Sequence, residues 1–372
     1  MRKQTLNEKI SKITTRDRLN SKSFACINSL LLHSFISLMQ ISASIYSSKD
    51  KSLPEIVTEL DLHEVDLFHV DCNDDEQVFS DIAYINANSK TPVDLHIISN
   101  TPEKYFSKIA ECKIRQVSFQ YENFASEIQF PASEVQFGLA ITSNTPITVF
   151  DEYREVCSYV LLMTTTPGKS GGTFNKDTFR RIRQFQKRYP DKSIQVDGGV
   201  NAEVSFILRN LGVESAVVGS YLFSEKYVGT ALLNLKKQVV GSHFLLKDFM
   251  LMDDELPVIQ EAELNFEKAL LEIETYKMAF VLITDTYGIL KGLISNADVR
   301  KGLLKNMDNL QNIQMSDIIN PCPIAMNENK TIYDLLLFIK NINFPLQYLP
   351  VVNDHNKLTG AILFTNLIKG EL

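Results

Sequence analysis

Two histidines and two aspartates are the residues of this chain whose types could share one chemical site: His69, Asp71, His96 and Asp197. Each lies near the end of a short run of aliphatic and β-branched residues, DLFHVD, PVDLHII or SIQVDGG. Imidazole nitrogen and carboxylate oxygen both coordinate divalent ions such as Zn²⁺, Mn²⁺ and Fe²⁺. If the ends of these runs meet in space, the four side chains predict a site for one such ion.

The two aspartates suit a second task. Placed on opposite faces of a sugar, Asp71 and Asp197 could remove a proton from one side and return a proton to the other. A metal ion would polarise the adjacent carbonyl and stabilise the enediolate charge that develops. This combination predicts epimerisation of a carbon next to a ketone.

Three glycine-rich turns predict a phosphate site: PGKSGG from Pro167, DGG from Asp197 and VGS from Val218. Glycine lets backbone amides approach an oxyanion closely, and the loops after the late strands of a barrel commonly hold phosphate. Each turn alone is weak support, because loops are rich in glycine. Together with the histidines and aspartates, the turns favour a sugar-phosphate substrate.

The elements that must position these residues form a repeating pattern from Met39 to Phe223. Eight β-rich runs occur there, namely ISASI, DLFHVD, PVDLHII, IRQVSFQ, VQFGLAI, YVLLMT, SIQVDGG and SAVVGS. Amphipathic stretches such as SLPEIVTELDLHE and NKDTFRRIRQFQKRYP separate several of them. Because parallel strands need crossovers, this alternation predicts a (β/α)₈ TIM barrel, whose active site lies at the C-terminal ends of its strands. We expect its last helix to run from about Ser224 to Val240.

The motifs ISASIYSSKD, DLFHVDCND, PVDLHIISNTPEKY, VLLMTTTPGKSGGTF, IQVDGGVN and VVGSYLF occur in the order typical of the ribulose-phosphate 3-epimerase family, which residues 39–223 resemble. The resemblance implies that Asp71 and Asp197 are the acid/base pair and that both bind the metal with His69 and His96. It implies that Ser44 and His96 contact substrate near the reacting centre. The remaining substrate contacts that it implies are Gly171, Gly172, Gly198, Gly199, Gly219 and Ser220.

The chain departs from that family pattern around the expected pocket. Asn73 stands where the family has a methionine that lies over the substrate, and the loop after it is shorter. Lys169 and Ser170 lie inside the turn Gly168–Gly172. These changes predict retained proton transfer on another ketose phosphate or a longer sugar phosphate, with Lys169 either meeting an extra charge or remaining a solvated loop lysine. Decarboxylases and aldol-type synthases of related architecture are disfavoured, because no D-x-K motif follows the second strand.

Two similar blocks, about residues 250–307 and 315–372, follow a boundary near Gly241 and form an internal repeat. In the first block, Gly292–Asp298 reads GLISNAD, which resembles the nucleotide motif of CBS (cystathionine β-synthase-type) domains. The resemblance implies a tandem CBS α+β module in which Ser295 reaches phosphate and Asp298 accepts hydrogen bonds from the ribose of an adenine nucleotide. Leu363 and Asn366 replace these residues in the second block, which predicts one competent site. Alternatively, the pair only dimerises the protein.

The composition argues against some classes of binding partner and some locations. The net charge of −7 and the lack of a dense Lys/Arg block argue against nucleic acid. Five scattered cysteines indicate reduced thiols in a cytoplasm, and the apolar stretch 24–39 is too short and too polar to span a membrane. We expect a cytoplasmic homo-oligomer.

The predicted organisation is an N-terminal extension of uncertain status (1–38), a barrel (39–240) and a CBS pair (241–372). The predicted function is a metal-dependent epimerase for D-ribulose 5-phosphate and D-xylulose 5-phosphate or a related ketose phosphate, regulated by a nucleotide. The alternative is a non-catalytic sensor or scaffold that binds sugar phosphate and nucleotide.

Overall fold

The computed structural model describes residues 39–364, except for Glu127, Ser170, Lys226 and the segments 237–243, 311–312 and 343–345. The predicted N-terminal extension and the predicted domain boundary near Gly241 both lie outside this part of the chain.

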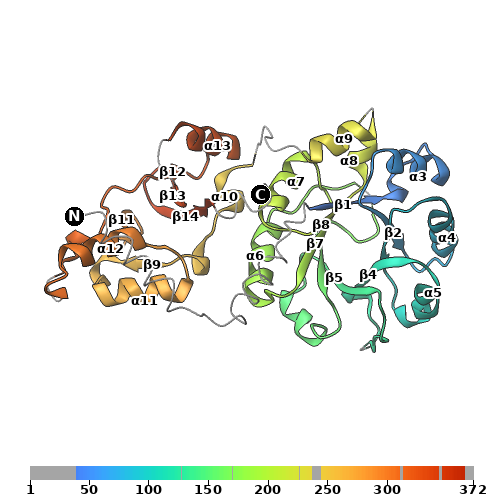
Figure 1. Ribbon diagram of the computed structural model, residues 1–372, viewed down its shortest axis with the longest axis horizontal. Helices are drawn as coiled ribbons and strands as arrows, with labels where there is room; N and C mark the ends of the chain where they lie inside the picture. The colour runs from blue at the N-terminus through green and yellow to red at the C-terminus, as the bar shows by residue number, and fades with distance from the viewer. Residues whose placement is uncertain are drawn as a thin grey trace, which may run out of the picture. The chain divides into compact units, whose positions relative to one another are not determined.

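Eight parallel strands close into a barrel in the order of the sequence (Figure 1). The first and last strands pair through Gln40–Ala43 and Ser215–Val218, which closes the ring. The strands are β1 (Gln40–Ser44), β2 (Leu67–Cys72), β3 (Val93–Ile97), β4 (Ile114–Gln120), β5 (Gln136–Ile141), β6 (Tyr159–Met163), β7 (Ser193–Asp197) and β8 (Ser215–Val218). The predicted (β/α)₈ barrel is therefore confirmed.

Helices follow six of the strands in the described part of the barrel: α3 (Leu53–Leu62), α4 (Val78–Asn88), α5 (Phe106–Glu111), α6 (Thr178–Arg188), α7 (Ala202–Asn210), and α8 (Ser220–Ser224) with α9 (Val228–Leu235). The described connections after β4 and β5 carry only short 3₁₀ helices, Tyr121–Asn123 and Ile147–Glu152. Pro131 interrupts the first connection, and the second contains the β-branched run Ile147–Val149, which has low helix propensity. The alternation of strands and helices that the sequence predicts does not indicate these two exceptions.

The last barrel helix predicted from about Ser224 to Val240 is present as α9, but it begins later than expected, and its predicted end lies outside the described residues. Helix α8 ends at Ser224, and α9 begins at Val228. Between them, Glu225 and Tyr227 have extended backbone conformations. Apolar spacing continues across this short break, which is why the sequence suggested a single helix.

The C-terminal region contains two three-stranded sheets with strand orders β11-β10-β9 and β12-β13-β14. The central strands are β10 and β13. Each pairs in parallel with the strand before it in the sequence and antiparallel with the strand after it. The first unit contains β9 (Val258–Gln260), α11 (Phe266–Tyr276), β10 (Phe280–Thr284), β11 (Leu290–Ser295) and α12 (Asn296–Lys305). The second contains β12 (Met326–Asn327), α13 (Ile332–Asn341), β13 (Tyr348–Val352) and β14 (Leu358–Leu363). The predicted α+β repeat is confirmed.

Buried aliphatic and aromatic residues on the barrel's strands and helices form one large core cluster, which also includes Ile332, Leu349 and Ile362 of the second C-terminal unit. Smaller buried clusters lie around the two C-terminal sheets. Burial of this apolar surface holds the strand ends, and the polar residues on them, in fixed positions. Among the helices of the described segments, none combines the length and the apolar character needed to cross a membrane.

Candidate active site in the barrel

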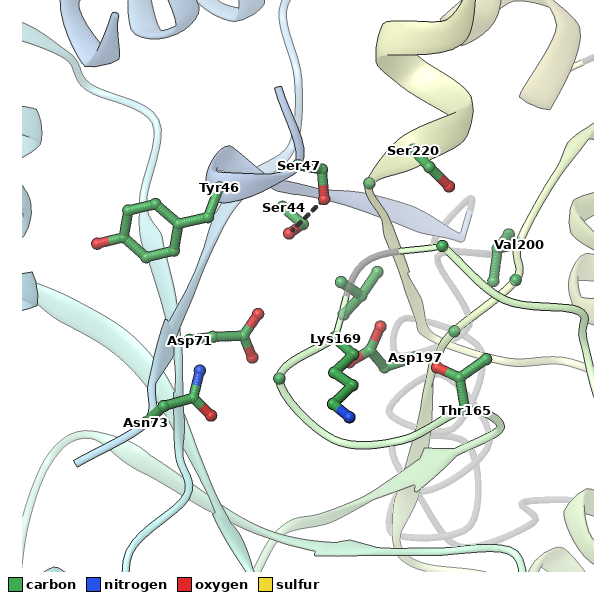
Figure 2. Close-up of a pocket in the computed structure, with 16 residues that line it drawn as sticks. Ser44, Tyr46, Ser47, Asp71, Asn73, Thr165, Lys169, Asp197, Val200 and Ser220 are labelled. Carbon is green, nitrogen blue, oxygen red and sulfur yellow. Dashed lines mark hydrogen bonds between the residues drawn. The ribbon is translucent and has the colours of Figure 1, made fainter. Parts of the chain in front are cut away.

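The four residues proposed as metal ligands lie together at one end of the barrel. His69 and Asp71 come from β2, His96 from β3 and Asp197 from the last position of β7. One ligand atom from each lies within 4.8 Å of the ligand atoms of all the others. Figure 2 shows Asp71 and Asp197 entering the same pocket from two different strands. The barrel thus brings together a set of residues that is scattered over almost 130 positions of sequence.

The His69 ring is oriented by hydrogen bonds on the side away from the cluster. Its Nδ1 atom lies 2.9 Å from Oδ2 of Asp94, and the Ser42 hydroxyl donates to the same oxygen at 2.7 Å. The Nε2 atom is buried without a hydrogen-bond partner, although it lies 3.4 Å from Oδ1 of Asp71. An imidazole whose other nitrogen donates to a carboxylate is the usual form of a metal-binding histidine.

His96 presents its other nitrogen to the cluster. Its Nε2 lies 2.9 Å from Oε1 of Gln120, while its Nδ1 lies 3.2 Å from Oδ1 of Asp71. Gln120 in turn donates from its amide nitrogen to the Glu122 carboxylate. One nitrogen of each histidine therefore remains directed at Asp71, and the donor set fits a divalent ion.

Asp94 and Gln120 are residues that sequence reasoning missed. Asp94 lies two positions before His96, on the same face of β3, and is almost fully buried. A carboxylate in the middle of a buried strand needs a partner, and this was the signal available in DLH. Gln120 gave no such signal, because a glutamine at the end of a strand is usually solvated.

The two candidate acid/base residues differ in their affinity for protons. Burial would raise the pKa of Asp71, but the charge of His69 and hydrogen bonds from both imidazoles hold the pKa below its usual value. Burial raises the pKa of Asp197 to about 6, His69 opposes this increase, and the charge of Asp71 adds to it. Two carboxyl groups with separated pKa values are the arrangement that acid/base pairs use.

The pocket above this cluster is lined by most of the predicted substrate contacts. They are Ser44, Gly171, Gly198, Gly199, Gly219 and Ser220, and the acid/base candidates Asp71 and Asp197 line the same pocket. His69 and His96 are fully buried beneath it. Gly172 is not among the lining residues; a Cβ atom built there would come within 2.6 Å of the Thr165 side chain. The pocket also includes Tyr46 and Ser47, which sequence reasoning did not select.

The turn after β7 requires glycine at two consecutive positions. Gly198 and Gly199 have φ angles of +112° and +63°, which side chains rarely allow. A Cβ on Gly198 would lie 2.3 Å from Oγ1 of Thr165, and a Cβ on Gly199 would lie 2.4 Å from the backbone nitrogen of Phe174. The loop after β6 therefore packs directly on the turn after β7.

Both departures from the family pattern lie in this pocket. A Cβ on Gly168 would meet the Asn73 amide oxygen at 2.2 Å, so Asn73 supports the loop after β6. Lys169 is exposed and is the one cationic side chain among the described lining residues. Figure 2 shows Asn73 close to Asp71, whereas Lys169 is drawn next to Asp197.

The residues predicted to bind nucleotide lie in a cleft of the C-terminal module. Ser295 and Asp298 line it together with Lys301, Asn320 and Tyr348. The Ser295 hydroxyl accepts a hydrogen bond from the backbone of Asp298 at 3.1 Å and donates to its carboxylate at 2.5 Å. The two side chains therefore form a capping box at the start of α12, which is a structural role in its own right. Leu363 is the last residue of β14, and Asn366 lies outside the described residues.

Solved structures of CBS-domain proteins share features with this region. The CBS-pair protein CBSX2 from Arabidopsis thaliana is 20% identical, with a TM-score of 0.30, covering 35% of this chain and 95% of that one. A CBS domain-containing protein of unknown function from Bacillus anthracis is 17% identical, with a TM-score of 0.30, covering 34% and 92%. Both identities and both scores are low, so the description of the module depends on its own topology.

Several proteins named ribulose-phosphate 3-epimerase are similar to this chain. The cytoplasmic isoform of ribulose-phosphate 3-epimerase from Oryza sativa is 28% identical over 169 residues, which cover 43% of this chain and 74% of that protein. Ribulose-phosphate 3-epimerases from Aquifex aeolicus and Methanocaldococcus jannaschii are each 25% identical, over 48% and 57% of this chain and 86% and 97% of theirs. The sequence model of the ribulose-phosphate 3 epimerase family matches residues 40–223. Residues 40–223, the barrel of this chain, therefore belong to the ribulose-phosphate 3-epimerase family.

Proposed function

We propose that the barrel is a metal-dependent epimerase that inverts the carbon next to the ketone of a ketose phosphate. The single observation that carries this proposal is the convergence of two carboxylates and two imidazoles within 4.8 Å, beside glycine turns at the C-terminal end of the barrel. Family membership and the names of the relatives support D-ribulose 5-phosphate and D-xylulose 5-phosphate as the first substrates to test.

In the proposed reaction, Asp71 and Asp197 act on opposite faces of the substrate. The ionised Asp71 carboxylate removes the proton from C3, and the electron pair of the broken C–H bond forms the C2–C3 double bond of an enediolate. Protonated Asp197 then returns a proton to C3 from the other face, which inverts the configuration. The reverse reaction exchanges the two roles.

His69 Nε2, His96 Nδ1 and the two aspartates would hold one ion of zinc, manganese or iron. When bound, the ion supplies electrostatic stabilisation to the negative charge that develops on the substrate oxygens. Asp94 and Gln120 keep the two imidazole rings in the required orientation and tautomer. A bound cation would also lower the pKa values of both aspartates.

The remaining pocket residues would bind the substrate. Ser44 lies at the end of β1, where its hydroxyl accepts a hydrogen bond from Ser47 at 3.0 Å, and we assign it to the reacting end of the sugar. We assign the phosphate to the turns after β6, β7 and β8, with contacts from Gly171, Gly172, Gly198, Gly199, Gly219 and Ser220. This assignment agrees with the usual phosphate site of such barrels.

The test is product formation from D-ribulose 5-phosphate, followed by NMR with Mn²⁺, Zn²⁺ or Fe²⁺ added in turn. Wild type and Asp191→Asn, a matched change of an exposed aspartate, are expected to form D-xylulose 5-phosphate at equal rates, and Asp197→Asn is expected to form none. If folded wild type is silent with every metal, this pentose phosphate is excluded. Other ketose phosphates and the non-catalytic sensor would then be examined.

A second candidate function concerns the C-terminal module, which we propose to be a CBS pair that binds an adenine nucleotide and regulates the barrel. Lys301, a cation, and Tyr348, an aromatic ring, join Ser295 and Asp298 in one cleft, and this combination favours a nucleotide. Calorimetric titration with AMP and ATP tests it, with Lys301→Ala expected to weaken binding and Lys291→Ala, on an exposed strand position, expected to have no effect. If no nucleotide binds while the protein dimerises through this region, the alternative of a dimerisation module is correct.

The domain boundaries 39–240 and 241–372, a cytoplasmic location and a homo-oligomeric state complete the proposal. Four cysteines in the described part of the chain are free thiols, which supports a reducing compartment.

A further inference from the structure

A short segment at the start of the C-terminal region, residues 244–255, contacts the barrel helix α6; we call it the anchor segment. Arg183 of α6 makes most of the contacts. Its guanidinium donates to both carboxylate oxygens of Glu255, at 2.7 and 2.9 Å, and to the backbone carbonyls of Phe249 and Met250, each at 3.0 Å. Both side chains of this ion pair are about nine-tenths buried. The planar fork of arginine suits this bidentate arrangement, which a lysine could not reproduce.

Two further pairs repeat the pattern along the first half of α6 and the turn before it. The Lys176 ammonium lies 2.6 Å from the Asp248 carboxylate, and Arg180 lies 2.8 Å from Asp254. Three cationic side chains of α6 and the turn before it thus form ion pairs with three carboxylates of the anchor segment. Exposed pairs contribute little stability individually, but here they fix the same register as the buried pair.

Aromatic rings continue this contact towards the active site. The Phe244 ring lies 5.7 Å from the Phe179 ring, which lies 4.9 Å from the Phe174 ring, measured between centroids. Phe174 lies in the loop after β6, four residues before α6 begins, and its backbone nitrogen is the atom that a Cβ on Gly199 would meet. The anchor segment therefore contacts the loop that carries Gly171 and Gly172 through a row of three phenylalanine rings, which ends beside the turn after β7.

The anchor segment is also tied to the C-terminal sheets. The Leu246 amide donates to the carbonyl of Lys330 at 2.8 Å, and Leu251 pairs with Ala361 of β14 through two backbone hydrogen bonds of 2.8 and 3.0 Å. Displacing it would leave the buried charge of Arg183 without its partner, which is strongly unfavourable. The module and α6 are thus mechanically connected.

We propose that the anchor segment positions the loop after β6, so that the barrel's affinity for the substrate phosphate depends on the C-terminal module. Arg183 and Lys176 are positioning residues in this proposal, because they act through the loop and touch no substrate. The inference rests on the proposed function, in which this loop binds phosphate.

The first test uses the full chain with Arg183→Lys, which keeps the charge but loses the fork. We expect the KM for D-ribulose 5-phosphate and the inhibition constant of inorganic phosphate to rise about tenfold, with kcat within about twofold of wild type. Arg188→Lys is the matched control, because Arg188 lies on the same helix but pairs with Asp151 of the barrel; both constants should stay unchanged. A lower kcat with unchanged KM, or an equal effect of both variants, would overturn the proposal.

A second test needs no turnover. Hydrogen exchange of the amides of residues 165–176 should be about tenfold faster in Arg183→Lys than in wild type or Arg188→Lys, and Lys176→Met should cause a smaller increase if Arg183→Lys fails to fold. Unchanged exchange in folded variants would contradict the positioning role. If the wild type is inactive but the exchange differs as described, the positioning role stands and only the assigned reaction fails.

Discussion

The barrel pocket and the C-terminal cleft both contain residues that sequence motifs pointed to, but the fold uses them differently. In the barrel, His69 Nε2 is buried with no hydrogen-bond partner, and Asp197 is a half-buried carboxyl group whose pKa is raised by burial. Such groups cost folding free energy unless something binds them. In the cleft, Ser295 and Asp298 satisfy each other in a helix cap. Polar groups without hydrogen-bond partners are therefore stronger evidence of a functional site than motif residues that already have a structural role.

Of the experiments that test this comparison, removal of the metal should cause the largest change in the measured epimerase rate. Because two imidazoles and two carboxylates are gathered around one position, chelation should lower the epimerase rate at least about a thousandfold, and one equivalent of Mn²⁺, Zn²⁺ or Fe²⁺ should restore it. Metal content and rate are measured together after dialysis. Full activity in protein shown to contain no metal would mean that the unsatisfied histidine nitrogen has another purpose.

Asp94→Asn should produce the next largest effect. The change removes the carboxylate that fixes the tautomer of His69, so we expect metal affinity to fall about 10- to 100-fold. Competition with a chromogenic chelator measures the affinity, and Asp191→Asn serves as the exposed control. Equal affinities in the two variants would reduce Asp94 to a packing residue.

Lys169→Met separates the two interpretations of the altered loop. If Lys169 meets a charge on the substrate, the KM for a ketose bisphosphate should rise about tenfold while that for the monophosphate changes less than about twofold. Lys192→Met, outside the pocket, is the control. Equal KM values for both substrates would identify Lys169 as a solvated loop lysine.

Ser295→Ala should have the smallest effect and tests the cleft directly. Loss of the cap should lower the free energy of unfolding by about 1 kcal/mol, as should Thr331→Ala at the corresponding cap of α13. Urea denaturation measures both. If Ser295 also binds nucleotide, only Ser295→Ala will weaken AMP binding; equal AMP affinities would leave Ser295 with the cap alone.

The sequence predicted the eight strands and the four candidate metal ligands, because short runs of aliphatic and β-branched residues and the chemistry of individual side chains are local signals. It did not predict the break between α8 and α9, where apolar spacing continues through two extended residues. It also missed Gln120, whose role is set by a strand neighbour, and the pairing of Arg183 with Glu255, which joins positions 72 residues apart. Contacts of this kind depend on how distant parts of the chain pack after folding, and no periodic pattern in the sequence marks them.

Proton exchange in D₂O tests the two-carboxylate account most directly. Wild type should incorporate one deuterium at C3 with inversion. With metal content confirmed in each, Asp197→Asn and Asp71→Asn should each exchange C3 of only one epimer without inversion, and of opposite epimers, because each variant retains the base for one face. If either single variant still inverts the substrate, or if both exchange the same epimer, then Asp71 and Asp197 do not act on opposite faces and the central claim is wrong.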